Sequence, residues 1–78
     1  MILVDDLIEF KHKRKKYAHM VSTTSIQELH DFAKSIGVKK HFFHRGNHYD
    51  IREEEHKKAI EAGAKLVSSK ELVKRMIK

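Results

Sequence analysis

The segment from Ser25 to Gly37 constrains the fold most, because its start, its periodicity and its end all indicate a helix. Ser25 and Glu28 have the spacing of a capping box, in which the serine hydroxyl accepts from a backbone amide and the glutamate reaches back. Apolar side chains then recur at helical spacing, and Gly37 is a natural stop. We therefore predict an amphipathic helix over residues 25–36. Its apolar positions are Ile26, Leu29, Phe32, Ala33 and Ile36.

Short apolar runs on both sides of this helix are predicted strands. The connection between the first two runs, residues 5–16, is predicted to be polar, and it ends in a basic, mobile loop over residues 11–16. The chain has no proline and no low-complexity stretch, so a single domain over residues 1–78 is expected. The predicted strands are residues 2–4, 17–21, 41–43 and 64–67.

Two further helices are predicted in the second half of the chain. One covers residues 50–62, with Asp50 as its N-cap and Glu53 as its capping-box partner. The other begins at Ser68 or Ser69 and buries an apolar stripe. Alternating strands and helices imply crossover connections. We therefore predict an α/β domain with about three helices and a small, mainly parallel sheet of about four strands.

Composition narrows the classes of protein and partner. The 78 residues include no cysteine, which excludes disulfides and thiolate metal sites and fits a reducing, cytoplasmic compartment. No apolar run approaches the ~18 residues of a membrane span, so no membrane partner is expected. The formal net charge of +6 favours polyanions or phosphorylated ligands. A core this small also favours association, and a homodimer is expected.

Polar side chains gather where the predicted strands end. In a parallel sheet, ligands bind beyond the carboxyl ends of the strands, where helix amino termini offer free amides to an anion. The segment from His44 to Asp50 is the densest, with two imidazoles, a guanidinium, an amide, a phenol and a carboxylate. We predict that Arg45 and the helix amino termini near Asp50 and Ser68 bind phosphate.

The histidines in these segments are the candidate catalytic groups. A neighbouring carboxylate can fix the tautomer of a histidine and make it a general acid or base. His48 and His19 are expected to form the acid/base pair, and Asp5 is expected to orient a histidine or to contact a ribose hydroxyl. Tyr49 is expected to stack on the ligand or to hydrogen-bond with it. The predicted ligand-binding set also contains His30, His44, Asp50 and Ser68.

Two other interpretations of the same residues stay open. In a structural interpretation, Asp50 caps a helix, Tyr49 packs in the core and His30 lies on a helix surface. In the other, side chains that converge in space hold a divalent metal ion. No spacing typical of a metal site is present, so no metal ligand or cofactor is predicted. The candidate ligands would be Asp5, Asp6, His19 and His48.

The basic run followed by Tyr17 supports an alternative class of function. Basic residues neutralise phosphates, and an aromatic ring can stack on a base. The chain would then be a nucleic-acid-binding accessory protein. A third class is a non-catalytic module that sequesters a ligand or blocks a host partner. The nucleic-acid contacts would come from Lys11, Lys13, Arg14, Lys15 and Lys16.

The order of motifs along the chain is also informative. An aspartate follows the first apolar run, a histidine lies in the second, and Glu28-Leu29-His30 and His48-Tyr49-Asp50 come after them. This order resembles small bacterial and phage proteins classified as domain of unknown function 4031. The resemblance covers nearly the whole chain and implies no established reaction. Residues 10–16 depart from it, because similar proteins tend to have an uncharged loop there.

Taken together, these features predict a protein that binds a small phosphorylated ligand, such as a nucleotide or an ADP-ribose-like compound. Hydrolysis of that ligand is an open second step, so the sequence does not decide whether the chain is an enzyme.

Overall fold

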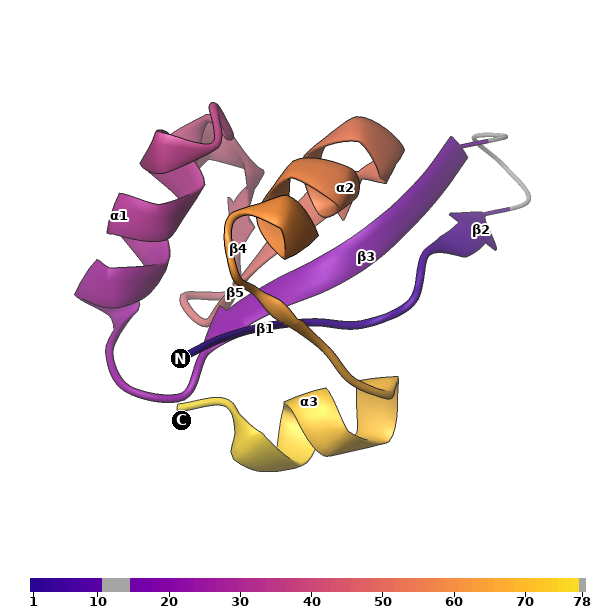
Figure 1. The fold of residues 1–78 in the computed structure, drawn as a ribbon. Coiled ribbons are helices and arrows are strands. Elements are labelled where there is room, and N and C mark those ends of the chain that lie inside the picture. Colours follow the sequence, from indigo (N-terminus) through magenta and orange to yellow (C-terminus); the bar gives the residue numbers. More distant parts are fainter. Residues whose placement is uncertain (11–14, 78) are drawn as a thin grey trace.

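A mixed sheet runs through the middle of the molecule (Figure 1). The computed structural model describes residues 1–10 and 15–77. Within them, five strands follow the order β4-β5-β3-β1-β6, and a sixth, β2, pairs with β3 off this path. The strands are β1 (Ile2–Val4), β2 (Ile8–Phe10), β3 (Lys15–Ser22), β4 (Phe43–His44), β5 (His48–Arg52) and β6 (Lys65–Leu66).

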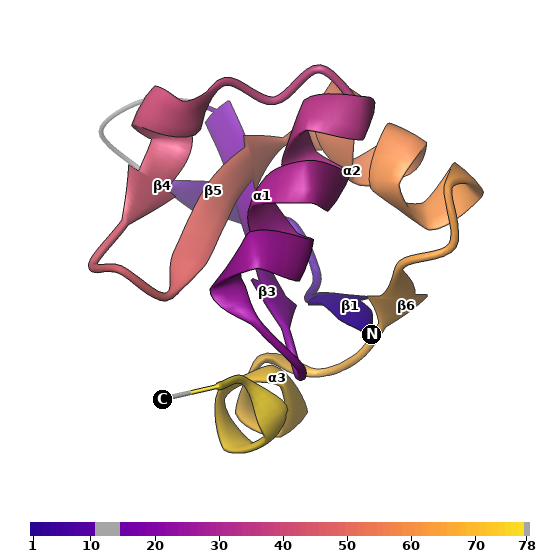
Figure 2. The ribbon, with the colours of Figure 1, turned by 90° about the vertical axis from the view of Figure 1, so that its left-hand side faces the viewer.

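Helices cover the two faces of this sheet unequally (Figure 2). Helices α1 (Ile26–Ser35) and α2 (Glu53–Glu61) lie on one face, and the short helix α3 (Ser69–Arg75) lies on the other. A 3₁₀ turn, η1 (Lys40–Phe42), leads into β4. Among the described residues, no helix is both long and apolar enough to cross a membrane.

The predicted mainly parallel sheet is wrong. Among the described strands, β1 and β6 form the one parallel pair, and the other four pairs are antiparallel. Parallel neighbours need a long crossover, whereas antiparallel neighbours can be joined by a tight turn. No helix separates β1, β2 and β3 among the described residues, and β4 and β5 are joined by a tight turn, so these strands run antiparallel. Strand β2 lies in the segment that was predicted to be a polar connection.

The predicted helix over residues 50–62 begins later than expected, and Asp50 is not its N-cap. Residues 48–51 alternate between partly buried and buried side chains, which is typical of a half-buried strand, and they extend β5 instead. Helix α2 starts at Glu53, and the Glu55 carboxylate accepts the Arg52 N–H at 2.8 Å. Similarly, the predicted strand over residues 41–43 is mostly η1.

Helix α1 confirms the prediction from its capping residues. The Ser25 hydroxyl accepts the N–H of Glu28 at 3.0 Å, and Gly37 has a φ of 80°, which suits the residue after a helix. The Glu28 carboxylate does not complete the box. It accepts from the Ser22 hydroxyl at 2.5 Å instead, so it ties the start of α1 to the end of β3.

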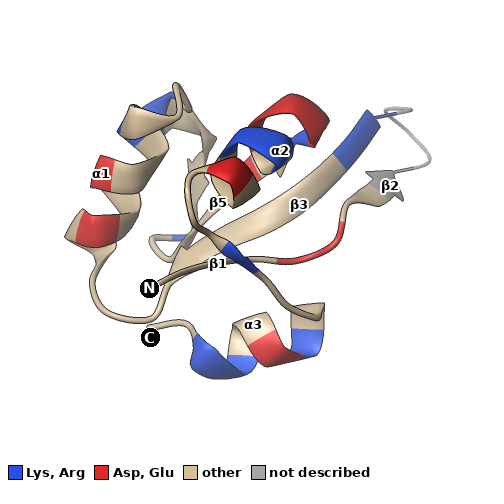
Figure 3. Cartoon of the chain, in the orientation of Figure 1, with Lys and Arg blue, Asp and Glu red and all other residues tan. Residues whose placement is uncertain are grey.

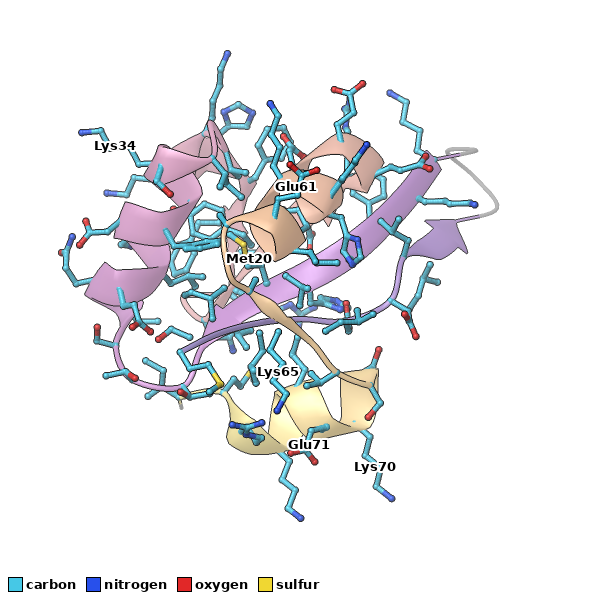
Figure 4. All side chains as sticks on the ribbon, in the orientation of Figure 1. Met20, Lys34, Glu61, Lys65, Lys70 and Glu71 are labelled. Carbon is cyan, nitrogen blue, oxygen red and sulfur yellow. The ribbon has the colours of Figure 1, made fainter. Side chains whose placement is uncertain are left out.

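Two apolar clusters bury the two faces of the sheet. The larger one fills the space under α1 and α2, where Met20 of β3 lies between the sheet and α2 (Figure 4). The smaller one consists of Leu3, Val21 and Leu72, with Val67 and Met76 packed against it. Helix α3 therefore covers only the part of its sheet face that lies around β1. The rest of that face, over β3, β5 and β4, carries polar side chains.

The cap of α1 makes a testable contribution to stability. Replacing Ser25 with alanine removes the acceptor for the Glu28 N–H, so we expect the free energy of unfolding to fall by about 1 kcal/mol. Ser25→Asp keeps an acceptor at the same position and serves as the control. Urea unfolding followed by circular dichroism measures both, and a Ser25→Ala protein as stable as the wild type would contradict the assignment.

Candidate functional site

Asp5 is fully buried, directly after β1, at the point where the pairing of β1 with β3 ends. Its backbone N–H donates to the carbonyl of His19 at 3.2 Å, and its Oδ1 accepts the backbone N–H of His19 at 2.6 Å. The carboxylate therefore takes the place of a backbone carbonyl in the ladder. This local arrangement locks Asp5 onto the middle of β3.

The second carboxylate oxygen of Asp5 fixes the His19 ring. Oδ2 lies 2.8 Å from His19 Nδ1 and also accepts the Ser69 hydroxyl at 2.8 Å. Because Oδ2 accepts the Ser69 hydroxyl and faces Nδ1 as an acceptor, a neutral His19 ring is expected to carry its proton on Nδ1 and a lone pair on Nε2. The His56 Nε2–H donates to the Asp5 carbonyl at 2.8 Å and holds the backbone of the same residue.

Strand register brings further histidines next to His19. His19 lies opposite Asp50 in the β3–β5 pair, and His44 lies opposite His48 in the β4–β5 pair. The ring centroids of His19 and His48 are 5.2 Å apart, and those of His44 and His48 are 6.0 Å apart. We call these four residues, His19, His44, His48 and Asp50, the histidine cluster.

Asp50 and Asn47 organise the other rings of the histidine cluster. The His48 Nδ1–H donates to Asn47 Oδ1 at 2.6 Å, while its Nε2 lies 3.2 Å from Asp50 Oδ1. The other oxygen of Asp50 lies 3.3 Å from His44 Nε2. Burial lowers the pKa of His48, Asp50 opposes this effect, and charges on His19 and His44 add to it. The His48 side chain is 16% exposed, whereas that of His44 is 51% exposed.

The cluster lies on a sheet face rather than at the carboxyl ends of the strands. The expectation of a shared rim assumed parallel strands, and antiparallel neighbours bring opposite ends together at each edge. Residues of β3 and β5 alternate between faces, so His19, His48 and Asp50 lie on the side that carries α3. The structure thus brings Asp5, His19 and His48 together, as the predicted site requires.

Tyr49 and His30 lie on the opposite face and are not part of the cluster. Tyr49 is 1% exposed, and its hydroxyl lies 2.7 Å from His30 Nδ1. Burial raises the pKa of Tyr49. The ring of Tyr49 therefore does not face the cluster, and its predicted contact with a ligand stays a prediction. Both residues border a groove of about 590 Å³ beside α1, which Lys34, Lys39 and Lys40 also line.

The groups that were predicted to bind phosphate lie in separate parts of the structure. Arg45 is exposed at the turn between β4 and β5. Arg45 and Gly46 both have positive φ angles, of 55° and 70°, which is the left-handed conformation that tight β-hairpin turns favour. Ser68 caps α3 by accepting the Glu71 N–H at 3.1 Å. Asp50 is not at a helix amino terminus, and α2 begins with three glutamates, which disfavours an anion there.

Sequence reasoning missed three supporting residues: Asn47, His56 and Ser69. Ser69 is one of the two residues at which the last helix was expected to begin, and Asn47 is the amide of the segment from His44 to Asp50. His56 had no signal, because it contacts Asp5 across 51 residues of chain.

The basic run that would contact nucleic acid in the alternative function lies only partly within the residues that the structure describes. Lys11, Lys13 and Arg14 are outside the described residues. Lys15 and Lys16 begin β3, so they belong to a strand rather than to the predicted loop, and they form an exposed basic patch at its far end (Figure 3).

The bond between Asp5 and His19 gives a prediction for Asp5→Asn. An amide in place of the carboxylate loses charge-assisted bonds, so we expect unfolding to require about 1–3 kcal/mol less free energy. The amide N–H₂ can also donate to His19 Nδ1, which would move the ring proton to Nε2. Urea unfolding measures the first effect, and ¹⁵N chemical shifts of the imidazole measure the second.

Asp6→Asn is the matched control, because Asp6 is the exposed neighbour. It is expected to change stability by less than about 0.5 kcal/mol and to leave the His19 tautomer unchanged. A wild-type His19 with its proton on Nε2 would contradict the role assigned to Asp5.

A family model described as protein of unknown function (DUF4031) matches residues 2–78. No curated protein and no solved structure matches the chain. The match spans β1, the histidine cluster and α3, and it confirms the resemblance to this family. The chain therefore belongs to the DUF4031 family, whose function is unknown.

Proposed function

We propose that the protein binds a small phosphorylated ligand, such as a nucleotide or an ADP-ribose-like compound, at the histidine cluster and hydrolyses it. The observation that carries this proposal is the contact between the buried Asp5 carboxylate and the partly exposed His19 ring. The carboxylate holds the ring so that its unprotonated Nε2 belongs to a group of two further imidazoles and a carboxylate.

Hydrolysis requires a group that activates a water molecule. An oriented imidazole nitrogen does this by taking the proton of the water or by holding a metal ion that lowers its pKa. His19 and His48 both have Nδ1 engaged, by Asp5 and Asn47, so Nε2 is the reactive nitrogen that we propose for each ring, with Asp50 3.2 Å from that of His48. The ring positions are set by strands rather than by loops, which favours a preorganised site.

The charge around the cluster supports a phosphorylated ligand. The chain carries a formal net charge of +6, and Arg45 and Arg52 lie before and after the cluster residues of β5. Arg52 is exposed and lies opposite Tyr17 in the β3–β5 register. Guanidinium groups bind phosphate with two parallel hydrogen bonds. Tyr17 lies opposite Arg52 on the cluster's side of β3, whereas Tyr49 lies on the other face of the sheet.

The experiment is a product assay with His48→Ala. Purified protein is incubated with nucleotides, ADP-ribose and simple phosphate esters, with and without added divalent metal ions, and the products are separated by chromatography. We expect wild-type turnover and a loss of about 100-fold or more in the variant, because the oriented Nε2 is gone. His41→Ala is the control, since His41 is exposed and packs on Phe42 away from the cluster.

Other outcomes separate the alternatives. A ligand that raises the melting temperature of the wild type but not of His48→Ala, with no product formed, would support a sequestering module and overturn hydrolysis. Oligonucleotide binding that weakens steeply with salt and ignores His48→Ala would overturn the whole proposal in favour of the basic patch.

A further inference from the structure

We propose that the histidine cluster is a binding site for one divalent transition-metal ion of the zinc type, with His19, His48 and Asp50 as its ligands. One ligand atom from each of these three side chains lies within 4.8 Å of the other two, and all three residues are partly buried. The site combines two strands, because His19 belongs to β3 and the other two belong to β5.

The partners of the two rings are those that metal-ligating histidines have. Such histidines almost always donate the N–H that faces away from the metal to a carboxylate or a carbonyl oxygen. His19 Nδ1 lies 2.8 Å from Asp5 Oδ2, and His48 Nδ1 lies 2.6 Å from Asn47 Oδ1. Two independent side chains thus direct the lone pair of each ring to Nε2.

The contact between His48 and Asp50 suits a cation held between them. With the ring proton on Nδ1, His48 Nε2 is an acceptor, yet it lies 3.2 Å from the acceptor Asp50 Oδ1. A second proton on the ring would satisfy this one contact. A metal ion would satisfy it and also bind Nε2 of His19, whose proton Asp5 holds on Nδ1. The ion therefore accounts for more of the arrangement than a proton does.

The donor set also indicates the kind of metal. Two imidazoles and one carboxylate form the ligand set of catalytic zinc sites, which keep one position open for water or substrate. Helix α3 packs on Leu3 and Val21 of this sheet face, apart from the three ligand residues. His44 lies 3.3 Å from the other oxygen of Asp50 and holds that carboxylate from outside.

The proposal of a metal site is argued from the geometry of the histidine cluster alone. A role of the ion in hydrolysis rests on the proposed function. Two neutral imidazoles and one carboxylate leave a divalent ion with a net positive charge, which would attract a phosphate group. A bound ion of this kind also lowers the pKa of its water to about 7.

Calorimetric titration of chelator-treated protein with Zn²⁺, without substrate, tests the site. We expect one ion per chain in the wild type and an affinity about 100-fold lower in His48→Ala and in Asp50→Asn. Asp5→Asn is expected to weaken binding by about 10–100-fold, as the loss of a positioning residue does. The visible absorption of Co²⁺ reports the coordination geometry of the bound ion, and it should lose intensity in the same variants but not in His41→Ala.

Both ligand variants replace partly exposed side chains on a sheet surface, so they are expected to fold, which circular dichroism checks. Wild-type protein that binds Zn²⁺ no more tightly than His48→Ala and Asp50→Asn overturns the site. Zn²⁺ binding without hydrolysis of any tested ligand overturns only the proposed function. Hydrolysis that depends on His48, in a protein that does not bind the ion, overturns only the metal site.

Discussion

The buried carboxylate of Asp5 is the interaction on which the rest of the structure depends. It joins the end of β1 to His19 of β3 and to Ser69 at the start of α3, and His56 of α2 binds its backbone. Burying a charged group costs several kcal/mol unless hydrogen bonds replace the lost water. Here the hydrogen bonds come from the backbone and ring of His19 in β3 and from the Ser69 hydroxyl in α3, so both elements must be folded for the carboxylate to be paired. The site and the packing of the helices around it are therefore formed by the same contacts.

The unequal covering of the sheet decides where chemistry can occur. Helices α1 and α2 bury one face with a continuous apolar cluster, whereas α3 buries the other face only around Leu3 and Val21. Beyond α3, the strands offer imidazoles and a carboxylate on a rigid surface. His19 and Asp50 are direct partners in the antiparallel β3–β5 pair. Their positions therefore follow from backbone hydrogen bonds between the two strands.

Two short motifs of the chain each combine residues with different positions in the fold. In His48-Tyr49-Asp50, the outer two side chains belong to the cluster, and the middle one packs under α1. In Glu28-Leu29-His30, Leu29 is a core residue, and His30 lies within hydrogen-bond distance of Tyr49. His30 of the helix thus contacts β5 from the opposite face, and the histidine cluster draws only on alternate residues of β3 and β5.

The sequence by itself determined the elements whose signals are local. Helix α1 and the Ser68 cap of α3 follow from side chains that bind backbone amides three residues away, and Asp5, His19 and His48 were identifiable by residue type. Only the tertiary structure decided the antiparallel register, the extension of β5 to Arg52 and the separation of Tyr49 from the cluster. It also decided that Asp5, His56 and Ser69 meet. The physical reason is that a capping bond depends on neighbours in the chain, whereas register depends on which face of a strand the whole core buries.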